Sequence, residues 1–177
     1  MKKLLGEARR NKLLTLLKQS NEPLTGTDLS KIVGVSRQVI VGDMTLLKAR
    51  NEPIIATSQG YVFFEKTNAK PLFERQIACI HSPEDAKDEL YTLVDAGVLV
   101  KNVTIEHPVY GDLTASIQVS NRHEVDLFVQ KVNETGAGFL SELTGGIHLH
   151  LIVASDPSFL NRAEEAMTEK GYLANEQ

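Results

Sequence analysis

Two histidines, His148 and His150, stand two positions apart in a stretch whose alternating pattern predicts a β-strand. Side chains at i and i+2 of a strand lie on the same face, so the two imidazoles would lie roughly 6–7 Å apart. That spacing allows the pair to bind one divalent cation. It fits two solvent-facing imidazoles equally well, so the pair by itself leaves both interpretations open.

Other residues with coordinating or acid–base side chains lie at the ends of predicted elements. His81 ends one predicted strand, and His107 ends another. Glu89 lies two turns into the helix that is expected to follow His81. Cys79 alternates with apolar neighbours, which is typical of a core position. The chain has neither a Cys-X-X-Cys nor a His-Glu-X-X-His motif, so no common metal motif organises these residues.

The elements that must position these residues follow one another in the order βαββαβα. One short turn joins the second and third strands, so we expect an antiparallel sheet with helices on one face. A ferredoxin-like or a phosphocarrier-like open sandwich would fit, and the pattern leaves the strand order open. Strands are predicted over 72–80, 98–107, 113–119 and 145–154, and helices over 82–96, 121–134 and 157–170.

A different pattern precedes this sandwich. Apolar residues at helical spacing predict helices over 4–17, 25–33 and 36–50. Gly34 can turn the chain between the second and third helices, and Ser36 is a good N-cap for the third. Two short β-branched and aromatic runs, 54–57 and 61–64, predict a hairpin. A winged helix-turn-helix joined to the sandwich makes the overall class α+β.

The helix-turn-helix pattern predicts DNA binding, because a helix fits the major groove and its first residues reach the base edges. Those residues are Ser36, Arg37 and Gln38, while Thr45 and Lys48 lie further along and could contact phosphates. A helical subdomain for protein contacts is the other interpretation. Over residues 13–63 the chain resembles the winged helix-turn-helix of biotin-repressor-like bacterial regulators, through Val35-Ser36-Arg37-Gln38-Val39-Ile40 and Gly60-Tyr61-Val62.

Charge divides the chain in the same place. Residues 1–66 carry 11 lysines and arginines against 6 acidic residues, whereas residues 67–177 carry 8 against 17. A basic half suits a polyanion and an acidic half repels one. We therefore predict a DNA-binding domain over 1–66, a linker over 67–71 and a second domain over 72–177. The single cysteine and the absence of a signal peptide or a long apolar run favour a cytoplasmic protein that does not enter a membrane.

Three segments of the second half resemble the three histidine motifs of the 3H domain, which niacin-responsive transcriptional repressors carry fused to this type of winged helix. They are His81-Ser82-Pro83, His107-Pro108-Val109-Tyr110-Gly111 and Gly145-Gly146-Ile147-His148-Leu149-His150. The resemblance implies a domain that binds a divalent metal and senses niacin. The metal ligands that it implies are His81, Glu89, His148 and His150. Three imidazoles and one carboxylate suit Zn, Ni or Fe(II) better than Mg or Ca.

The resulting hypothesis is a repressor of niacin uptake or NAD biosynthesis genes, not an enzyme, with nicotinate or nicotinamide as co-repressor. A homodimer would place two recognition helices on a palindromic operator. His107, Tyr110 and Arg75 are the candidates for contacting the effector. Two alternatives are a small-molecule metalloenzyme with a fused DNA-binding domain, and a DNA-binding protein that responds to no ligand.

Overall fold

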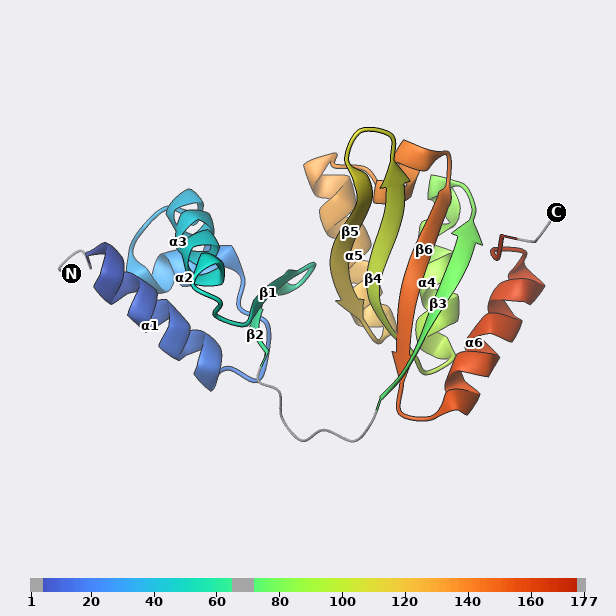
Figure 1. The fold of residues 1–177 in the computed structure, drawn as a ribbon, viewed down its shortest axis with the longest axis horizontal. Coiled ribbons are helices and arrows are strands. Elements are labelled where there is room, and N and C mark those ends of the chain that lie inside the picture. The colour runs from blue at the N-terminus through green and yellow to red at the C-terminus, as the bar shows by residue number, and fades with distance from the viewer. Residues whose placement is uncertain (1–4, 65–71, 175–177) are drawn as a thin grey trace. The chain divides into compact units, whose positions relative to one another are not determined.

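The computed structural model describes residues 5–64 and 72–174. The chain divides into two compact units, Met1–Thr67 and Asn68–Gln177 (Figure 1). The predicted linker, 67–71, and Leu4 at the start of the first predicted helix lie outside the described residues. Neither part of the described chain contains a helix with the length and apolar character needed to cross a bilayer.

Unit 1 has three helices followed by a hairpin, as predicted. The side chain of Thr25 caps α2 by accepting a hydrogen bond from the Asp28 amide, and Gly34 ends that helix with φ 69°. This left-handed conformation, which glycine adopts without strain, turns the chain into α3. The elements are α1 (Gly6–Gln19), α2 (Gly26–Val33), α3 (Arg37–Ala49), β1 (Ile54–Thr57) and β2 (Gly60–Phe63).

A small apolar core holds these helices together. The inward faces of all three helices and the first residue of β1 supply it, and all of its members are almost fully buried. They are Leu13, Leu17, Leu29, Val33, Ile40, Met44, Leu47 and Ile54. Because α3 buries only one side in this core, its opposite side is left exposed.

Unit 2 confirms the predicted order βαββαβα. Its elements are β3 (Phe73–Ile80), α4 (Ala86–Asp95), β4 (Leu99–His107), β5 (Gly111–Val119), α5 (Arg122–Thr135), β6 (Ile147–Ala154) and α6 (Pro157–Lys170). Two 3₁₀ turns, Pro83–Asp85 and Leu140–Thr144, precede α4 and β6. The second turn was not predicted. The first replaces the initial turn of the predicted helix, because the Ser82 hydroxyl donates to the Asp85 carboxylate and caps no amide.

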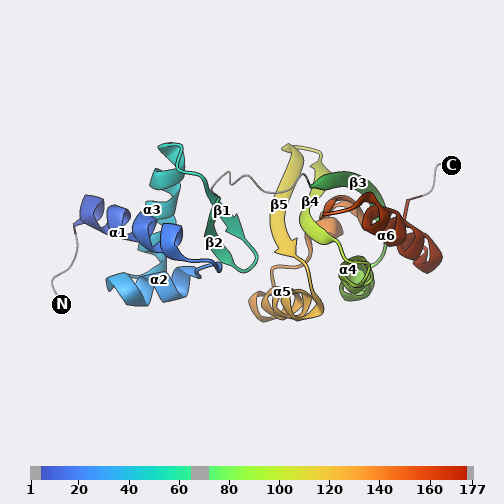
Figure 2. The ribbon, with the colours of Figure 1, turned by 90° about the horizontal axis from the view of Figure 1, so that it is seen from below.

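The four strands form one antiparallel sheet in the order β3-β6-β4-β5, and α4, α5 and α6 cover one of its faces (Figure 2). The first strand therefore lies at the edge, and the last strand lies inside. This order is that of the phosphocarrier-like sandwich and not of the ferredoxin-like one. Between this sheet and the helices lies the main core, which includes Ile77, Leu93, Ile152 and Met167.

A short C-terminal segment adds to the outer edge of β3. The Ile80 amide donates to the carbonyl of Tyr172, and the Ala174 amide donates to the carbonyl of Ala78. The Tyr172 hydroxyl also donates to the carboxylate of Asp88 on α4. These bonds fix the segment over the end of β3 that leads into His81.

Candidate metal centre and DNA-binding face

Three histidines converge on a single buried carboxylate. The Nε2 atoms of His81, His148 and His150 lie 2.8, 3.1 and 3.3 Å from the carboxylate oxygens of Glu89. All four side chains are at most 4% exposed. The four residues that the 3H resemblance implied as ligands therefore lie together, although they are widely separated in sequence.

The sheet register explains this convergence. His148 and His150 share one face of β6, as their two-residue spacing predicted, and this face is the one that packs against the helices. β3 runs antiparallel beside β6 with Cys79 opposite His148, so His81, just past the end of β3, lies next to this pair. The imidazole centroids of His81 and His148 are 4.9 Å apart. Glu89 projects from the buried side of α4 into the same space.

Each imidazole is oriented by a backbone carbonyl. His81 Nδ1 lies 2.7 Å from the Ser82 oxygen, His148 Nδ1 lies 2.8 Å from the Gly146 oxygen, and His150 Nδ1 lies 2.8 Å from the Asn102 oxygen. A carbonyl can only accept, so each Nδ1 carries the hydrogen and donates it. In a neutral ring, Nε2 then holds the lone pair. Such carbonyl contacts on the outer nitrogen are typical of metal-ligating histidines.

Lone pairs on Nε2 that face a carboxylate need a proton or a cation between them. His148 and His150 have hydrogen-bonding geometry to Glu89. The Nε2 atom of His81 is buried and has no hydrogen-bond partner among the described residues, despite its short distance to the carboxylate. This orphaned nitrogen and the donor set both fit a bound transition metal.

The pKa shifts of these residues are those expected when a carboxylate and imidazoles are buried together. Burial by itself would raise the pKa of Glu89, but the charge of His150 and the hydrogen bonds of His148 and His150 hold that pKa well below its ordinary value. Burial would lower the pKa of His81 and of His150, and the Glu89 carboxylate outweighs it and raises both. The carboxylate is thus kept ionised in an apolar setting by positive charge around it.

Cys79 is a neighbour of this cluster that the sequence pattern assigned only to the core. Ligand atoms of Cys79, Glu89 and His148 all lie within 4.8 Å of one another, and Cys79 is fully buried. Burial, with the Glu89 charge second, raises the pKa of the thiol. Cys79 therefore belongs to both the core and the cluster. Its place opposite His148 depends on the β3–β6 register, which the sequence did not fix.

Gly146 lies against the backbone of His81, beside this cluster. Its φ is 98°, and a Cβ at this position would come within 2.2 Å of the His81 carbonyl oxygen. Only a residue without a side chain allows the two segments to approach this closely. The ring of Tyr172 packs edge-on against the ring of His81, at a centroid distance of 5.5 Å. Gly146 belongs to the third histidine motif, whose paired glycines leave room for another segment to approach, whereas no sequence motif pointed to Tyr172.

The three predicted effector residues lie in two different places. His107 ends β4, and its Nδ1 accepts hydrogen bonds from the amides of Val109 and Tyr110. The Tyr110 ring lies 5.1 Å from the His107 ring and is mostly exposed. Arg75 pairs with Ile152, two residues beyond His150, so the register separates it from His81 by six residues of β3.

The guanidinium of Arg75 already has partners on α6. It donates to Glu164 at 2.6 Å and to Asn161 at 2.8 Å. Contact with an effector at the histidine cluster would require Arg75 to leave both partners and to reach along the strand. The geometry thus separates Arg75 from the cluster.

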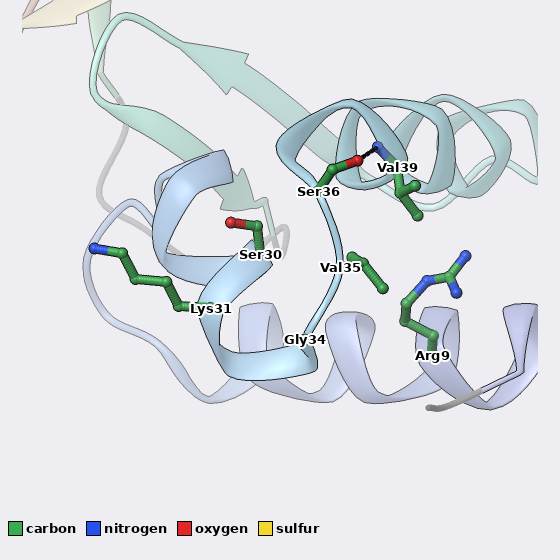
Figure 3. A pocket seen from close by; sticks show the side chains of 7 residues that line it. All are labelled: Arg9, Ser30, Lys31, Gly34, Val35, Ser36 and Val39. Carbon is green, nitrogen blue, oxygen red and sulfur yellow. Dashed lines mark hydrogen bonds between the residues drawn. The ribbon is translucent and has the colours of Figure 1, made fainter. Parts of the chain in front are cut away.

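Two hollows open on the surfaces of the separate units. One, of about 310 Å³, lies between α4, α5 and α6, and its lining includes none of the three predicted effector residues. The other, of about 670 Å³, lies in unit 1 where α1, the end of α2 and the start of α3 meet. Figure 3 shows Arg9 extending from α1 toward the start of α3, whereas Lys31 points away. Open space therefore borders the first turn of α3.

That first turn carries the predicted base-reading residues. The Ser36 hydroxyl accepts from the Val39 amide and caps the helix, and Ser36, Arg37 and Gln38 are all exposed. Thr45 and Lys48 are exposed as well, although the Thr45 hydroxyl donates to the carbonyl of Val41. All five predicted DNA-contacting residues are thus accessible on one helix.

The wing, which is the hairpin of β1 and β2, lies beside α3. Lys48 Nζ lies 5.9 Å from the centroid of the Tyr61 ring on β2. On its buried side, α3 presents Asp43, whose carboxylate bonds to Arg9 and Arg10 of α1. The helix is therefore attached to α1 by charge and to the wing by an aromatic contact. A helix held on two sides, with its outer side exposed, has the geometry needed to enter a DNA groove.

These features define a class: a DNA-binding regulator with a winged helix-turn-helix and a second domain built around a histidine–carboxylate cluster. A family model described as an HTH domain matches residues 9–62, and one described as the 3H domain matches residues 74–176. The chain is 54% identical over 172 residues to the transcription repressor NadR of Bacillus subtilis, covering 97% of this chain and 96% of that one. It is 36% identical over 174 residues to the probable transcription repressor NiaR of Thermotoga maritima, covering 98% of both.

The chain belongs to the 3H-domain family of niacin-responsive transcription repressors, as its motifs indicated. It is accordingly a DNA-binding repressor and not an enzyme, which sets aside the metalloenzyme alternative.

Proposed function

We propose that this repressor binds a palindromic operator as a cytoplasmic homodimer, and that nicotinate or nicotinamide acts as its co-repressor through a metal in unit 2. The genes it controls would be those of niacin uptake or NAD biosynthesis. The observation that carries the proposal is the arrangement of three Nε2 atoms around the Glu89 carboxylate, with every Nδ1 donating to a backbone carbonyl.

One divalent transition metal per chain would be held by His81, Glu89, His148 and His150. Imidazole donors favour Zn, Ni or Fe(II) over Mg or Ca. When bound, such a cation supplies a positive centre to which a pyridine nitrogen or a carboxylate binds within an acidic domain. Cys79 lies close enough to affect which cation is preferred.

His107 is the residue of this chain best suited to orient the effector. Because its Nδ1 accepts from two amides, the hydrogen of the neutral ring must be on Nε2, which can donate to a carboxylate or a carboxamide. Tyr110, which neighbours the His107 ring, can cover an aromatic ligand. Since Arg75 is bonded to α6, we assign it a structural role instead.

Repression requires that the effector favour the DNA-binding arrangement of the dimer. An effector shifts an equilibrium only by its difference in affinity for two states, and the coupling is reciprocal. Ser36, Arg37 and Gln38 would contact base edges, and Thr45 and Lys48 would contact phosphates. The recognition helices of the two subunits would lie about 34 Å apart on the operator.

A gel-shift titration tests this proposal. Nicotinate should tighten the binding of the metal-loaded protein to its operator, and a chelator should abolish that response. His148→Ala should bind operator only with the weaker, nicotinate-independent affinity. Operator affinity that stays constant under all of these conditions would instead support a repressor that responds to no ligand.

A further inference from the structure

α3 contains a glycine, Gly42, that no contact among the described residues requires. Gly42 lies near the middle of α3, in ordinary helical backbone, and it is exposed. A Cβ at this position would meet no atom within 4 Å among the described residues. Glycine is the poorest helix former after proline, so its presence here weakens the helix without improving any packing in the domain.

The position of Gly42 on the helix indicates a reason outside the chain. α3 buries Ile40, Asp43, Met44 and Leu47, and Gly42 lies on the opposite side. Residues four before and three after it on a helix are its neighbours, and here they are Gln38 and Thr45. Both are exposed, and both are among the residues proposed to contact DNA. Gly42 therefore lies beside Gln38 and Thr45 on the exposed side of α3.

Groove dimensions make a missing side chain useful at that place. An α-helix with its side chains is about 10–12 Å across, and the major groove is about 12 Å wide and 8.5 Å deep. How deeply the helix enters is then limited by the side chains on its outermost line. Without a Cβ at Gly42, the backbone of α3 can approach the base edges directly, which brings Arg37 and Gln38 within reach of them.

We infer that Gly42 is a specificity-determining residue that lets the backbone of α3 lie against the base-pair edges of the operator. The inference rests on the proposed role of α3 as the recognition helix. Any side chain at this position would hold the helix away from the bases, while phosphate contacts, which do not depend on sequence, would persist.

Gly42→Ala separates this role from a structural one because two readouts move in opposite directions. Helix stability should rise, which would make amide exchange in α3 about two- to fivefold slower in the full-length protein. Affinity for a duplex selected by the wild-type protein from a random library should fall about tenfold, or about 1.4 kcal/mol. Binding to a scrambled duplex should stay within about twofold. Gly42→Leu should lose still more of the selected-duplex affinity.

Thr15→Ala is the matched control. Thr15 is exposed on α1, and its hydroxyl donates to the carbonyl of Asn11, so alanine also strengthens a helix of unit 1 but adds nothing to α3. It should leave the affinity for both duplexes unchanged. Gly42→Ala with undiminished affinity for the selected duplex would overturn the inference.

Gln38→Ala distinguishes a failure of the inference about Gly42 from a failure of the assignment of α3 as the recognition helix. If Gln38→Ala loses discrimination between the two duplexes and Gly42→Ala does not, the inference about Gly42 alone is wrong. If neither variant changes discrimination, then α3 is not the recognition helix, and the inference falls with that assignment.

Discussion

The carboxylate of Asp43, in the middle of α3, accepts a 2.6 Å hydrogen bond from Nε of Arg9 on α1. A second bond of 3.2 Å from the same guanidinium makes the pair bidentate, and Arg10 adds a third at 3.4 Å. The Asp43 side chain is 3% exposed, and the two arginines are 13% and 15% exposed. α3 is thus attached to α1 by a nearly buried ion pair.

Asp43→Ala should strongly destabilise unit 1, because it leaves two guanidinium groups without their buried partner. Breaking a buried pair from one side costs roughly 3 kcal/mol or more. Amide exchange in α1 and α3 should become faster by about two orders of magnitude, whereas exchange in unit 2 should not change. Glu7→Ala removes an exposed partner of Arg10 and should have a much smaller effect. Similar exchange rates in both variants would contradict the claim that the buried Asp43 pair stabilises unit 1 more than the exposed Glu7 pair does.

Gly146→Ala should disrupt the histidine cluster, because the new methyl group would collide with the backbone carbonyl of His81. Affinity for Ni²⁺ or Zn²⁺, measured by calorimetry, should fall about 10- to 100-fold. This is the loss typical of removing a group that orients a metal-binding histidine. Gly145→Ala provides the control. Gly145 also has a positive φ, 63°, but a Cβ there would meet no described atom within 4 Å. That variant should lose about 1 kcal/mol of stability from backbone strain and keep its metal affinity.

His107→Asn should weaken the response to nicotinate. The asparagine side chain keeps an acceptor for the amides of Val109 and Tyr110 but lacks the donor at Nε2. The nicotinate concentration that gives a half-maximal gel shift should rise about tenfold, since a hydrogen bond to a charged group contributes about 1.5–3 kcal/mol. Metal content should not change. Arg75→Ala should leave the nicotinate response as it is, and a loss of response in that variant would show that Arg75 does contact the effector.

Acid should weaken α1 through Glu7. Hydrogen bonds from Arg50 first and Arg10 second lower the pKa of Glu7 from 4.5 to about 2. A carboxylate whose pKa is lower in the folded state stabilises the protein above pH 4.5, and that stabilisation is lost as the pH falls toward 2. Glu7→Gln should therefore be less stable than the wild type near neutral pH, with a difference that shrinks between about pH 4.5 and 2. A difference that does not vary with pH would mean that Glu7 is not perturbed.

Much of this architecture could be predicted from the sequence because local patterns determine it. Period-two alternation placed His148 and His150 on one face of β6, and capping residues such as Ser36 located the start of α3. The partners of these residues could not be predicted in the same way. That Cys79 lies opposite His148 follows from β3 pairing with β6, and strand pairing depends on the packing of the whole sheet.

The choice of Glu89 among several nearby carboxylates shows the same limit. Glu84, Asp85 and Asp88 lie close to it in sequence, and only the 3H resemblance pointed to Glu89. In the fold, Glu89 is 2% exposed on the buried side of α4, while Asp88 faces Lys170 and Tyr172. Which of these carboxylates faces the histidines depends on how α4 is rotated about its axis against the sheet. A run of neighbouring acidic residues does not by itself indicate that rotation.

The C-terminal segment at the outer edge of β3 has a consequence for solubility. An uncovered edge strand offers free amides and carbonyls to any other strand, which is a common route to aggregation. The Ile80 amide and the Ala78 carbonyl are already occupied by Tyr172 and Ala174. Proteolysis after Gly171 would remove this cover and leave the edge of β3 free to pair with strands of other molecules. Residues 172–174 thus help to protect unit 2 from aggregation through this edge.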